Sequence, residues 1–231
     1  MAHIVKFNKF DTSKINCEPV AKNKAGGNIV YLKYNEAKKI IIQTPIMTAP
    51  FGLSVFNDEA NGVSKYSVDL SFKGQESDER ISGFFNCITN LDNFMIDQAV
   101  QNSKDWFGKK MSKEVVKELY RPLIKESKDP SKYASTIKFK IRNTSDKLNV
   151  EAFDDQQNPF DMDNFAPGCK ARAIVELSSI WFVNKQFGCS FTVVQMQVSK
   201  PEKVQGFSFQ PDTDDEEEED EEESEYDEDE A

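Results

Sequence analysis

The chain has 231 residues, with 40 acidic and 29 basic side chains and a net charge of −11. Sixteen of the acids lie in residues 212–231, where there is no Lys or Arg, so residues 1–211 carry a net charge of +5. A basic body favours phosphate ligands, and a polyanionic tail can imitate a nucleic acid or bind basic proteins.

Composition also excludes several classes of protein. No stretch approaches the roughly 18 apolar residues of a membrane span. The four cysteines (Cys17, Cys87, Cys169 and Cys189) lack zinc-ligand spacing, and a disulfide framework is not expected in a chain this long. We therefore expect a soluble protein, intracellular or packaged in a particle, with no membrane contact.

Strand-like runs occupy the first third of the chain. Asn28–Tyr34 and residues 39–43 read as two strands joined by a polar turn, and residues 51–56 as a short edge strand. Residues 64–73 alternate cleanly, which places Tyr66, Val68, Leu70 and Phe72 on one side of a half-buried strand.

The hydrophobic period then changes to that of a helix. Ser77 is the expected N-cap of a helix that runs to about residue 103. A second helix, capped by Ser112, should end or kink at Pro122. We therefore expect a helical insertion over about residues 77–127.

Strands return in the last third of the body. Residues 136–142 and 147–153 read as a hairpin, residues 170–183 as one long strand, and residues 189–199 as the last strand. Beyond them the sequence is low in complexity and highly charged. The predicted division is a folded domain over residues 1–209 and a disordered acidic tail over residues 210–231.

The order of elements predicts a mainly β (α+β) protein. Antiparallel strands with a helix in mid-chain suggest an OB-type Greek-key barrel with extra strands and a helical insertion. A flatter sandwich with the same insertion is the alternative.

The sequence offers little for catalysis, so we expect no enzyme. Its only histidine is His3, and it has no phosphate-binding glycine motif. Four carboxylates in a loop (Asp154, Asp155, Asp161 and Asp163) could attract Mg²⁺, but a solvated acidic loop is the commoner meaning of such a cluster. We predict neither a metal nor a cofactor.

Binding chemistry is better supplied. Lys138, Lys140 and Arg142 share one face of their strand, about 6.6–6.8 Å apart, which is close to the phosphate spacing of an extended single strand. Lys170 and Arg172 likewise share a face. Such faces favour single-stranded nucleic acid, although lysines also protect ordinary sheet surfaces from aggregation.

Aromatic side chains near cations are the candidates for stacking on bases. Tyr31 lies on the same strand face as Lys33, and Trp181 precedes Lys185. Trp181 and Phe182 must face opposite sides of a strand, so one is core. Trp106 and Phe107 lie among several lysines. They belong either to a loop that contacts nucleic acid or to a turn between two helices that buried Trp106 holds in place.

The closing third of the body resembles a known family. It holds an acidic loop (EAFDDQQNPFDMDNF), a strand with a basic start (APGCKARAIVELSSIWF), an Asn184 to Gly188 turn, and the run VVQMQV before the tail. With the basic body and the Asp/Glu tail, this layout resembles the phage-type single-stranded-DNA-binding proteins and their relatives in large DNA viruses of algae and protists. The resemblance implies an OB fold in which these strands and their turn bind the substrate.

The same resemblance implies a role. Such a protein binds and protects single-stranded DNA, without strong sequence preference, in viral DNA replication, recombination or repair. It forms a homodimer, and its tail competes for the DNA site and recruits replication proteins such as a polymerase or helicase–primase. The implied location is a replication site in the nucleus or a cytoplasmic factory, or the virion.

The tail residues nominated for partner binding are its first acidic run and its one aromatic residue: Asp214, Asp215, Glu216, Glu217, Glu218, Glu219 and Tyr226. Tails of this family end in an aromatic residue, whereas this chain ends in Glu230 and Ala231. Two other classes stay open: a histone-chaperone-like protein that binds basic partners, and a structural virion protein.

Overall fold

Strands dominate the first of the two units into which the chain divides, Met1–Pro201 and Glu202–Ala231. The computed structural model describes residues 4–35, 39–58, 62–144, 147–201 and 209. It contains 41% strand and 23% helix, so the predicted mainly β class is confirmed. The predicted boundary between residues 209 and 210 stays a prediction.

The strand pairings close five strand positions into a barrel. In chain order, the five positions are β5–β6, β8, β11, β15 and β18. Around the ring, β5–β6 neighbours β8, β8 neighbours β11, β11 neighbours β18, β18 neighbours β15, and β15 returns to β5–β6, which is the order 1-2-3-5-4-1. β11 and β18 run parallel, whereas the other ring pairs are antiparallel. This is the predicted OB-type Greek-key barrel. Its strands are β5 (Ile40–Gln43), β6 (Met47–Thr48), β8 (Val63–Ser71), β11 (Thr136–Ile141), β15 (Lys170–Leu177) and β18 (Phe191–Ser199).

Additional strands extend the barrel, and a second sheet adjoins it. The extensions are β1 (Val5–Lys6), β7 (Leu53–Asp58), β10 (Ile124–Lys125) and β14 (Glu151–Phe153), and β12 (Asn143–Thr144) pairs with β13 (Lys147–Leu148). The second sheet contains β2 (Ile15–Cys17), β3 (Ala21–Lys22), β4 (Asn28–Tyr34), β9 (Tyr120–Arg121), β16 (Ser179–Val183) and β17 (Gln186–Cys189).

The alternation of the strands explains the barrel core. In β11, Ile137 and Phe139 are fully buried, while the lysines between them are exposed. Val68 and Leu70 of β8 are fully buried opposite them, and Phe191 of β18 packs against Phe139 with ring centroids 6.0 Å apart. Burying one face of each strand therefore fixes the register and leaves the cations outside.

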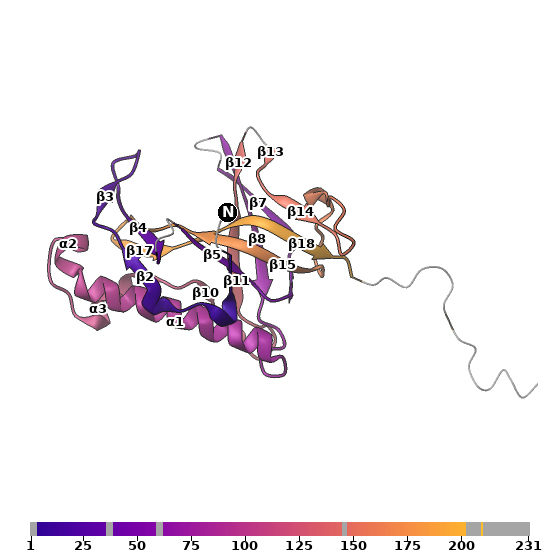
Figure 1. The fold of residues 1–231 in the computed structure, drawn as a ribbon, viewed down its shortest axis with the longest axis horizontal. Helices are drawn as coiled ribbons and strands as arrows, with labels where there is room; N and C mark the ends of the chain where they lie inside the picture. Colours follow the sequence, from indigo (N-terminus) through magenta and orange to yellow (C-terminus); the bar gives the residue numbers. More distant parts are fainter. Residues whose placement is uncertain (1–3, 36–38, 59–61, 145–146, 202–208, 210–231) are drawn as a thin grey trace, which may run out of the picture. The chain divides into compact units, whose positions relative to one another are not determined.

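The helical insertion lies between the second and third barrel strands. It comprises α1 (Glu79–Gln101), α2 (Ser103–Phe107) and α3 (Lys113–Leu119), and Figure 1 shows α1 running alongside the strands. The described ranges also contain three 3-10 turns: η1 (Phe7–Lys9), η2 (Thr12–Lys14) and η3 (Met162–Asn164). No helix in the described ranges has the length and apolar character needed to cross a membrane.

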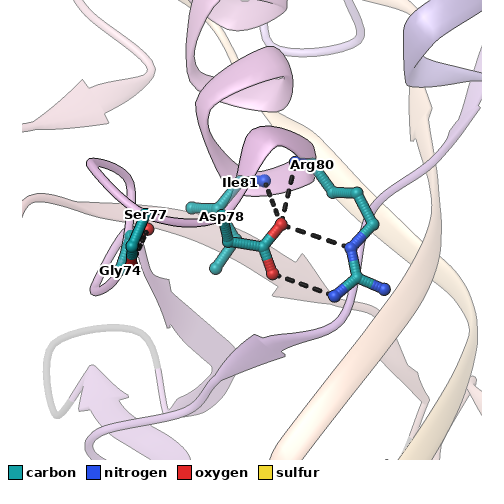
Figure 2. Close-up of polar contacts among 5 residues, drawn as sticks. All are labelled: Gly74, Ser77, Asp78, Arg80 and Ile81. Atoms are coloured by element: carbon teal, nitrogen blue, oxygen red, sulfur yellow. Dashed lines mark hydrogen bonds and ion pairs between the residues drawn. The ribbon is translucent and has the colours of Figure 1, made fainter.

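The N-cap of α1 is Asp78 and not Ser77, which corrects the sequence prediction (Figure 2). The Asp78 carboxylate accepts hydrogen bonds from the backbone N–H of Arg80 at 2.8 Å and of Ile81 at 3.4 Å. The Arg80 guanidinium also binds it, and these contacts lower the pKa of Asp78 to about 2. Ser77 instead donates to the Gly74 carbonyl oxygen, within the preceding turn.

Several predicted connections are wrong. Residues 136–142 and 147–153 do not pair with each other, because β11 pairs with β8 and β18 while β14 pairs with β18. Within the described residues, the antiparallel hairpin pairing at this point of the chain is limited to the two-residue strands β12 and β13. The long strand breaks at Ser178 into β15 and β16. Helix α3 ends at Leu119, before Pro122, because β9 pairs with β17.

Gly52 lies directly before β7 and allows the chain to pass close to another loop there. Its φ of +63° is a left-handed conformation, and an added Cβ would lie 2.6 Å from the Phe165 carbonyl oxygen and 2.9 Å from backbone atoms of Ala166 and Pro167. A side chain would therefore collide with rigid backbone, and only glycine fits where β7 leaves this loop.

Candidate nucleic-acid interface

The outward side chains of β8, β11 and β15, together with Arg142, form what we call the barrel face. The predicted shared faces are confirmed, because Lys138 and Lys140 alternate with buried residues in β11, as Lys170 and Arg172 do in β15. In OB-type barrels, the outer face of the second and third strands, with the loops after strands one and four, is the usual ligand surface. Here those strands are β8 and β11.

Lys138 is neutralised on this face. It lies opposite Asp69 in the register of β8 and β11, and its Nζ is 2.7 Å from Asp69 Oδ2. Asp69 is only 6% exposed. Because a buried carboxylate without a partner is costly, Lys138 has a structural task as well as an exposed charge.

Lys140 differs from its neighbour. Within the described part of the chain, no acid contacts it, and it lies opposite Ser67. Burial of its stem and the nearby positive charge of Lys65 lower the pKa of Lys140. Lys65 is paired with Asp58, so Lys140 is the charge that stays without an acid here, and an anion would stabilise it.

An exposed aromatic ring adjoins this pair of cations. Phe56 of β7 lies opposite Lys65, and its side chain is 63% exposed. The Lys65 Nζ is 5.9 Å from the centroid of that ring and 2.9 Å from Asp58 Oδ2. Phe56, Lys65 and Lys140 therefore bring a stacking surface and cations together on one face.

Arg142 is also paired with an acid. Its Nη2 lies 2.7 Å from Glu176 Oε1, and Lys39 Nζ lies 2.9 Å from Glu176 Oε2. Burial alone would raise the pKa of Glu176, but hydrogen bonds from Lys39 and Arg142 outweigh it and lower that pKa. Two cations around one carboxylate leave this part of the barrel face with a net positive charge.

Arg172 lies in a groove with both polar and apolar lining. Its Nε donates to Gln197 Oε1 at 2.6 Å, so a neutral amide and not a carboxylate orients it. Arg172 and Gln43 line both a cleft of about 400 Å³ and a neighbouring one of about 220 Å³, into which Lys6 and Arg80 also project. Lys170, two residues before Arg172, lies opposite Ser199 and Thr48.

Three nominated residues share the outward face of the second sheet. Tyr31 lies opposite Ser179, and Trp181 lies opposite Ile29, on the neighbouring strands β4 and β16. Tyr31 is 46% exposed, whereas Trp181 is half-buried, with its indole N–H donating to Ser190 Oγ at 3.1 Å. Lys33 forms an ion pair with Glu18. Exposure therefore favours Tyr31 over Trp181 as a stacking residue.

Lys185 lies elsewhere, at the tip of the β16–β17 hairpin. Asn184 and Lys185 have φ values of 50° and 64°, and Val183 pairs with Gln186, which is a two-residue hairpin turn. The turn is tighter than the predicted span from Asn184 to Gly188. Phe182, beside Trp181, packs against Phe187 with ring centroids 6.0 Å apart, so it is the inward member of that pair.

The nominated residues thus form three groups: five on the barrel face, three on the second sheet, and Lys185 at a hairpin tip. The nominated tail residues lie outside the described residues. Sequence reasoning missed Phe56 and Lys65. Both lie on predicted strands, but their proximity depends on the register of β7 and β8, which the sequence does not reveal.

The acidic loop has a structural role. Asp154 Oδ1 accepts hydrogen bonds from the backbone N–H of Gln156 and Asn158, and Asp161 caps η3. Among the described residues, no three His, Cys, Asp or Glu side chains gather as a metal site. The four cysteines are free thiols, two of them buried.

Half-buried Asp92 and buried Tyr120 and Cys189 form a cluster beneath the second sheet. Tyr120 Oη donates to Asp92 Oδ1 at 2.6 Å and lies 3.8 Å from Cys189 Sγ. The Leu123 N–H also donates to Asp92 Oδ1, at 3.2 Å. Burial raises the pKa of Asp92 to about 6, although these hydrogen bonds oppose the shift. The cluster fastens α1 to the chain segment that follows α3.

Fold and surface together define an OB-type barrel with a partly neutralised cationic face. The chain belongs to a protein family described as "Family of unknown function (DUF5871)", whose model matches residues 68–211. It is 27% identical over 175 residues to the uncharacterized protein L291 of Acanthamoeba polyphaga mimivirus. That alignment covers 74% of this chain but only 28% of the mimivirus protein.

Solved structures of phage proteins are similar in outline. The single-stranded-DNA-binding protein gp2.5 of bacteriophage T7 is 15% identical with a TM-score of 0.45, covering 74% of this chain and 98% of its own. The single-stranded-DNA-binding protein of bacteriophage Enc34, in complex with single-stranded DNA, is 10% identical with a TM-score of 0.41, covering 82% and 98%. Likeness at this level does not establish a function.

Proposed function

We propose that this protein binds single-stranded DNA without strong sequence preference, across the outer face of β7, β8 and β11. The observation that carries the proposal is Lys140, a cation without an acid partner in the described residues, beside Lys65 and the exposed ring of Phe56. Cations for the backbone and open aromatic faces for the bases are what sequence-tolerant binding of a single strand requires.

The groove around Arg172 supports the same proposal. It lies on β15, beyond β18 from β11, and it offers an arginine held by an amide. Strands in a sheet lie about 4.8 Å apart, so β11 and β15 are separated by about 10 Å across the barrel. Lys140 lies opposite Thr192, and Arg172 lies opposite Gln197, five residues further along β18. A single strand that runs obliquely across the barrel face would therefore reach Arg172 about three phosphates beyond Lys140.

The acidic tail suggests regulation. Sixteen carboxylates in residues 212–231 are tethered to a body of net charge +5, which gives the polyanion a high local concentration at cationic surfaces. We propose that the tail competes for the DNA site and, once displaced, recruits replication proteins. We also propose that the protein acts as a homodimer in viral DNA replication, recombination or repair, without catalysis of its own.

A titration tests the binding proposal. Fluorescein-labelled oligo-dT and a duplex of equal length are titrated with the full chain at several salt concentrations. We expect preference for the single strand, with the slope of log affinity against log salt near −0.7 for each phosphate contacted. A flat salt response, or equal affinity for the duplex, would contradict single-strand binding.

The main alternative is a histone-chaperone-like protein that binds basic partners. The sixteen acids of residues 212–231 favour it, since a polyanion attracts basic proteins. The ion pairs of Lys138 and Arg142 also reduce the charge available to DNA. A core histone added to the oligo-dT complex separates the two functions. A histone chaperone would bind the histone tightly and show no affinity for oligo-dT. A single-strand-binding protein would bind oligo-dT in the absence of the histone.

A further inference from the structure

A second concave surface lies at the helical insertion, and it contains none of the residues that carry the proposed DNA site (Phe56, Lys65, Lys140 and Arg172). We call it the insertion cleft. It has a volume of about 630 Å³, in the range typical of ligand sites. α2, α3 and the segment between them form one side, and the tips of the β3–β4 and β16–β17 hairpins form the other. Its apolar lining consists of Trp106, Phe107, Met111, Val115, Leu119 and Phe182.

Cations from three separate segments surround this apolar lining. Lys22 comes from β3, Lys109 from the segment between α2 and α3, and Lys185 from the β16–β17 turn. No Asp or Glu is among the described residues that line the cleft. Lys22 Nζ donates to Asn28 Oδ1 at 2.7 Å, a neutral acceptor. The cleft is therefore complementary to a ligand that is both acidic and apolar.

The aromatic rings are already engaged with one another. Trp106 is 5% exposed and meets Phe182 edge-on, with ring centroids 5.7 Å apart. Phe107 meets Phe182 and Phe187 in the same edge-on way. Trp106 therefore offers no open face to a nucleobase, and neighbouring rings cover part of Phe107 and of Phe182, whereas a stacked base needs an open aromatic face.

The most exposed apolar side chains of the lining are aliphatic. Val115 is 43% exposed and Val183 is 55% exposed, on opposite sides of the cleft. Met111 lies half-buried between α2 and α3, and its flexible thioether adapts to varied side chains. This lining suits an inserted peptide side chain better than a base.

We propose that the insertion cleft binds an acidic peptide segment of a partner protein, with one or two large apolar side chains inserted between α3 and the β16–β17 hairpin. The lysines at the rim contact the flanking carboxylates. The proposal rests on charge complementarity and on the aliphatic lining, and it does not require that the barrel face binds DNA.

Fluorescence anisotropy with the full chain tests this. The probe is a short labelled peptide of Asp and Glu with a Leu-Phe pair at its centre, and the matched probe has Ser-Ser in place of that pair. We expect the Leu-Phe probe to bind at low salt and the Ser-Ser probe to bind at least about tenfold more weakly, since it cannot bury apolar area.

Two variants locate the binding site. Val115→Asp should weaken binding of the Leu-Phe probe roughly tenfold, because it places a like charge on the apolar lining. Lys109→Glu should weaken it a few-fold, with an effect that shrinks as salt rises. Lys128→Glu makes the same charge change away from the cleft and is the control. Circular dichroism verifies the fold, and oligo-dT affinity should be unchanged in every variant.

Several results would overturn the proposal. They are equal binding of the two probes, no binding by the full chain, or unchanged binding by both cleft variants. Displacement of the probe by oligo-dT would assign the cleft to nucleic acid. Binding seen only after truncation beyond Gln210 would assign it to the chain's own acidic tail.

Discussion

The barrel face and the insertion cleft both carry lysines, but they present them differently. On the barrel face, Lys138 and Arg142 are held by nearly buried acids, and only part of the positive charge is left over. Around the cleft, Lys109 and Lys185 border an apolar hollow that no acid lines, within the described residues. Counting lysines therefore does not distinguish a stabilised sheet surface from a ligand site, whereas the partner of each lysine does.

Replacing Asp92 should have the largest effect on the free energy of unfolding. It tests whether a change beneath the second sheet leaves DNA binding on the barrel face unaffected. Burial raises the pKa of Asp92 from 3.8 to about 6. Between these values the unfolded chain loses the proton first, so the free energy of unfolding falls as pH rises from about 4 to 6. The loss is at most about 3 kcal/mol, and it persists above pH 6.

Asp92→Asn should remove that loss, because the amide stays neutral and still accepts from Tyr120. Urea unfolding of both proteins between pH 4 and 7 measures the difference. Oligo-dT affinity should be unaffected, since Asp92 lies beneath the second sheet. If the variant shows the same pH dependence as the natural chain, Asp92 is ionised at no cost and the expectation is wrong.

Lys138→Ala and Lys140→Ala sharpen the contrast within the barrel face itself. The first leaves the nearly buried Asp69 without its partner and should cost about 1–3 kcal/mol of stability. The second breaks no contact with an acid and should change stability by at most about 0.5 kcal/mol. Both should weaken oligo-dT binding and make the salt slope shallower, by about 0.7 for each lost phosphate contact.

Thermal melts and oligo-dT titrations of the two variants form a matched pair. They exchange the same residue type, two positions apart, on one strand. Equal melting temperatures would show that the ion pair of Lys138 is only a surface contact.

Phe56→Ala tests stacking at the edge of the barrel. The ring is 63% exposed, so the fold should be retained. Losing one stacked base should cost about 1–3 kcal/mol of binding, or about 5- to 150-fold in affinity for oligo-dT. Tyr31→Ala is the comparison, since Tyr31 lies on the second sheet. If only the Tyr31 variant loses affinity, the strand follows the second sheet and not the barrel.

Truncation after Gln210 should have the smallest effect and the one most sensitive to salt. Removing the acidic residues should raise affinity for oligo-dT at low salt, and the gain should fade as salt screens exposed charges. Titrations of both chains across a salt series measure it. If affinity for oligo-dT at low salt is unchanged, the tail does not compete with DNA and acts only by binding partner proteins. That result would favour the histone-chaperone alternative.

Local periodicity was enough to predict most of the elements. The alternation in β8 and β11 and the helical spacing of Phe84, Ile88, Leu91 and Met95 in α1 correspond to the observed buried faces. The Greek-key class followed from the order of strands and helices. The closure of the barrel could not be predicted in this way, because the parallel pairing of β11 with β18 joins segments about fifty residues apart.

The site was harder to predict for the same reason. In β8, Asp69 occupies an outward position like any solvated residue, and only the register with β11 shows that it neutralises Lys138. Glu176 likewise looks like an ordinary strand residue until Lys39 and Arg142 converge on it. Phe56 and Lys65 became candidates only through the pairing of β7 with β8.

Gly52 has a consequence for how this surface tolerates change. Because backbone atoms of residues 165–167 occupy the space of its missing Cβ, even alanine would push β7 away from the loop and displace Phe56 four residues later. In a saturation library selected for single-strand binding, position 52 should accept no substitute, while exposed Phe56 should still accept tyrosine or tryptophan. A binding surface can thus depend most strictly on a residue that has no side chain to touch the ligand.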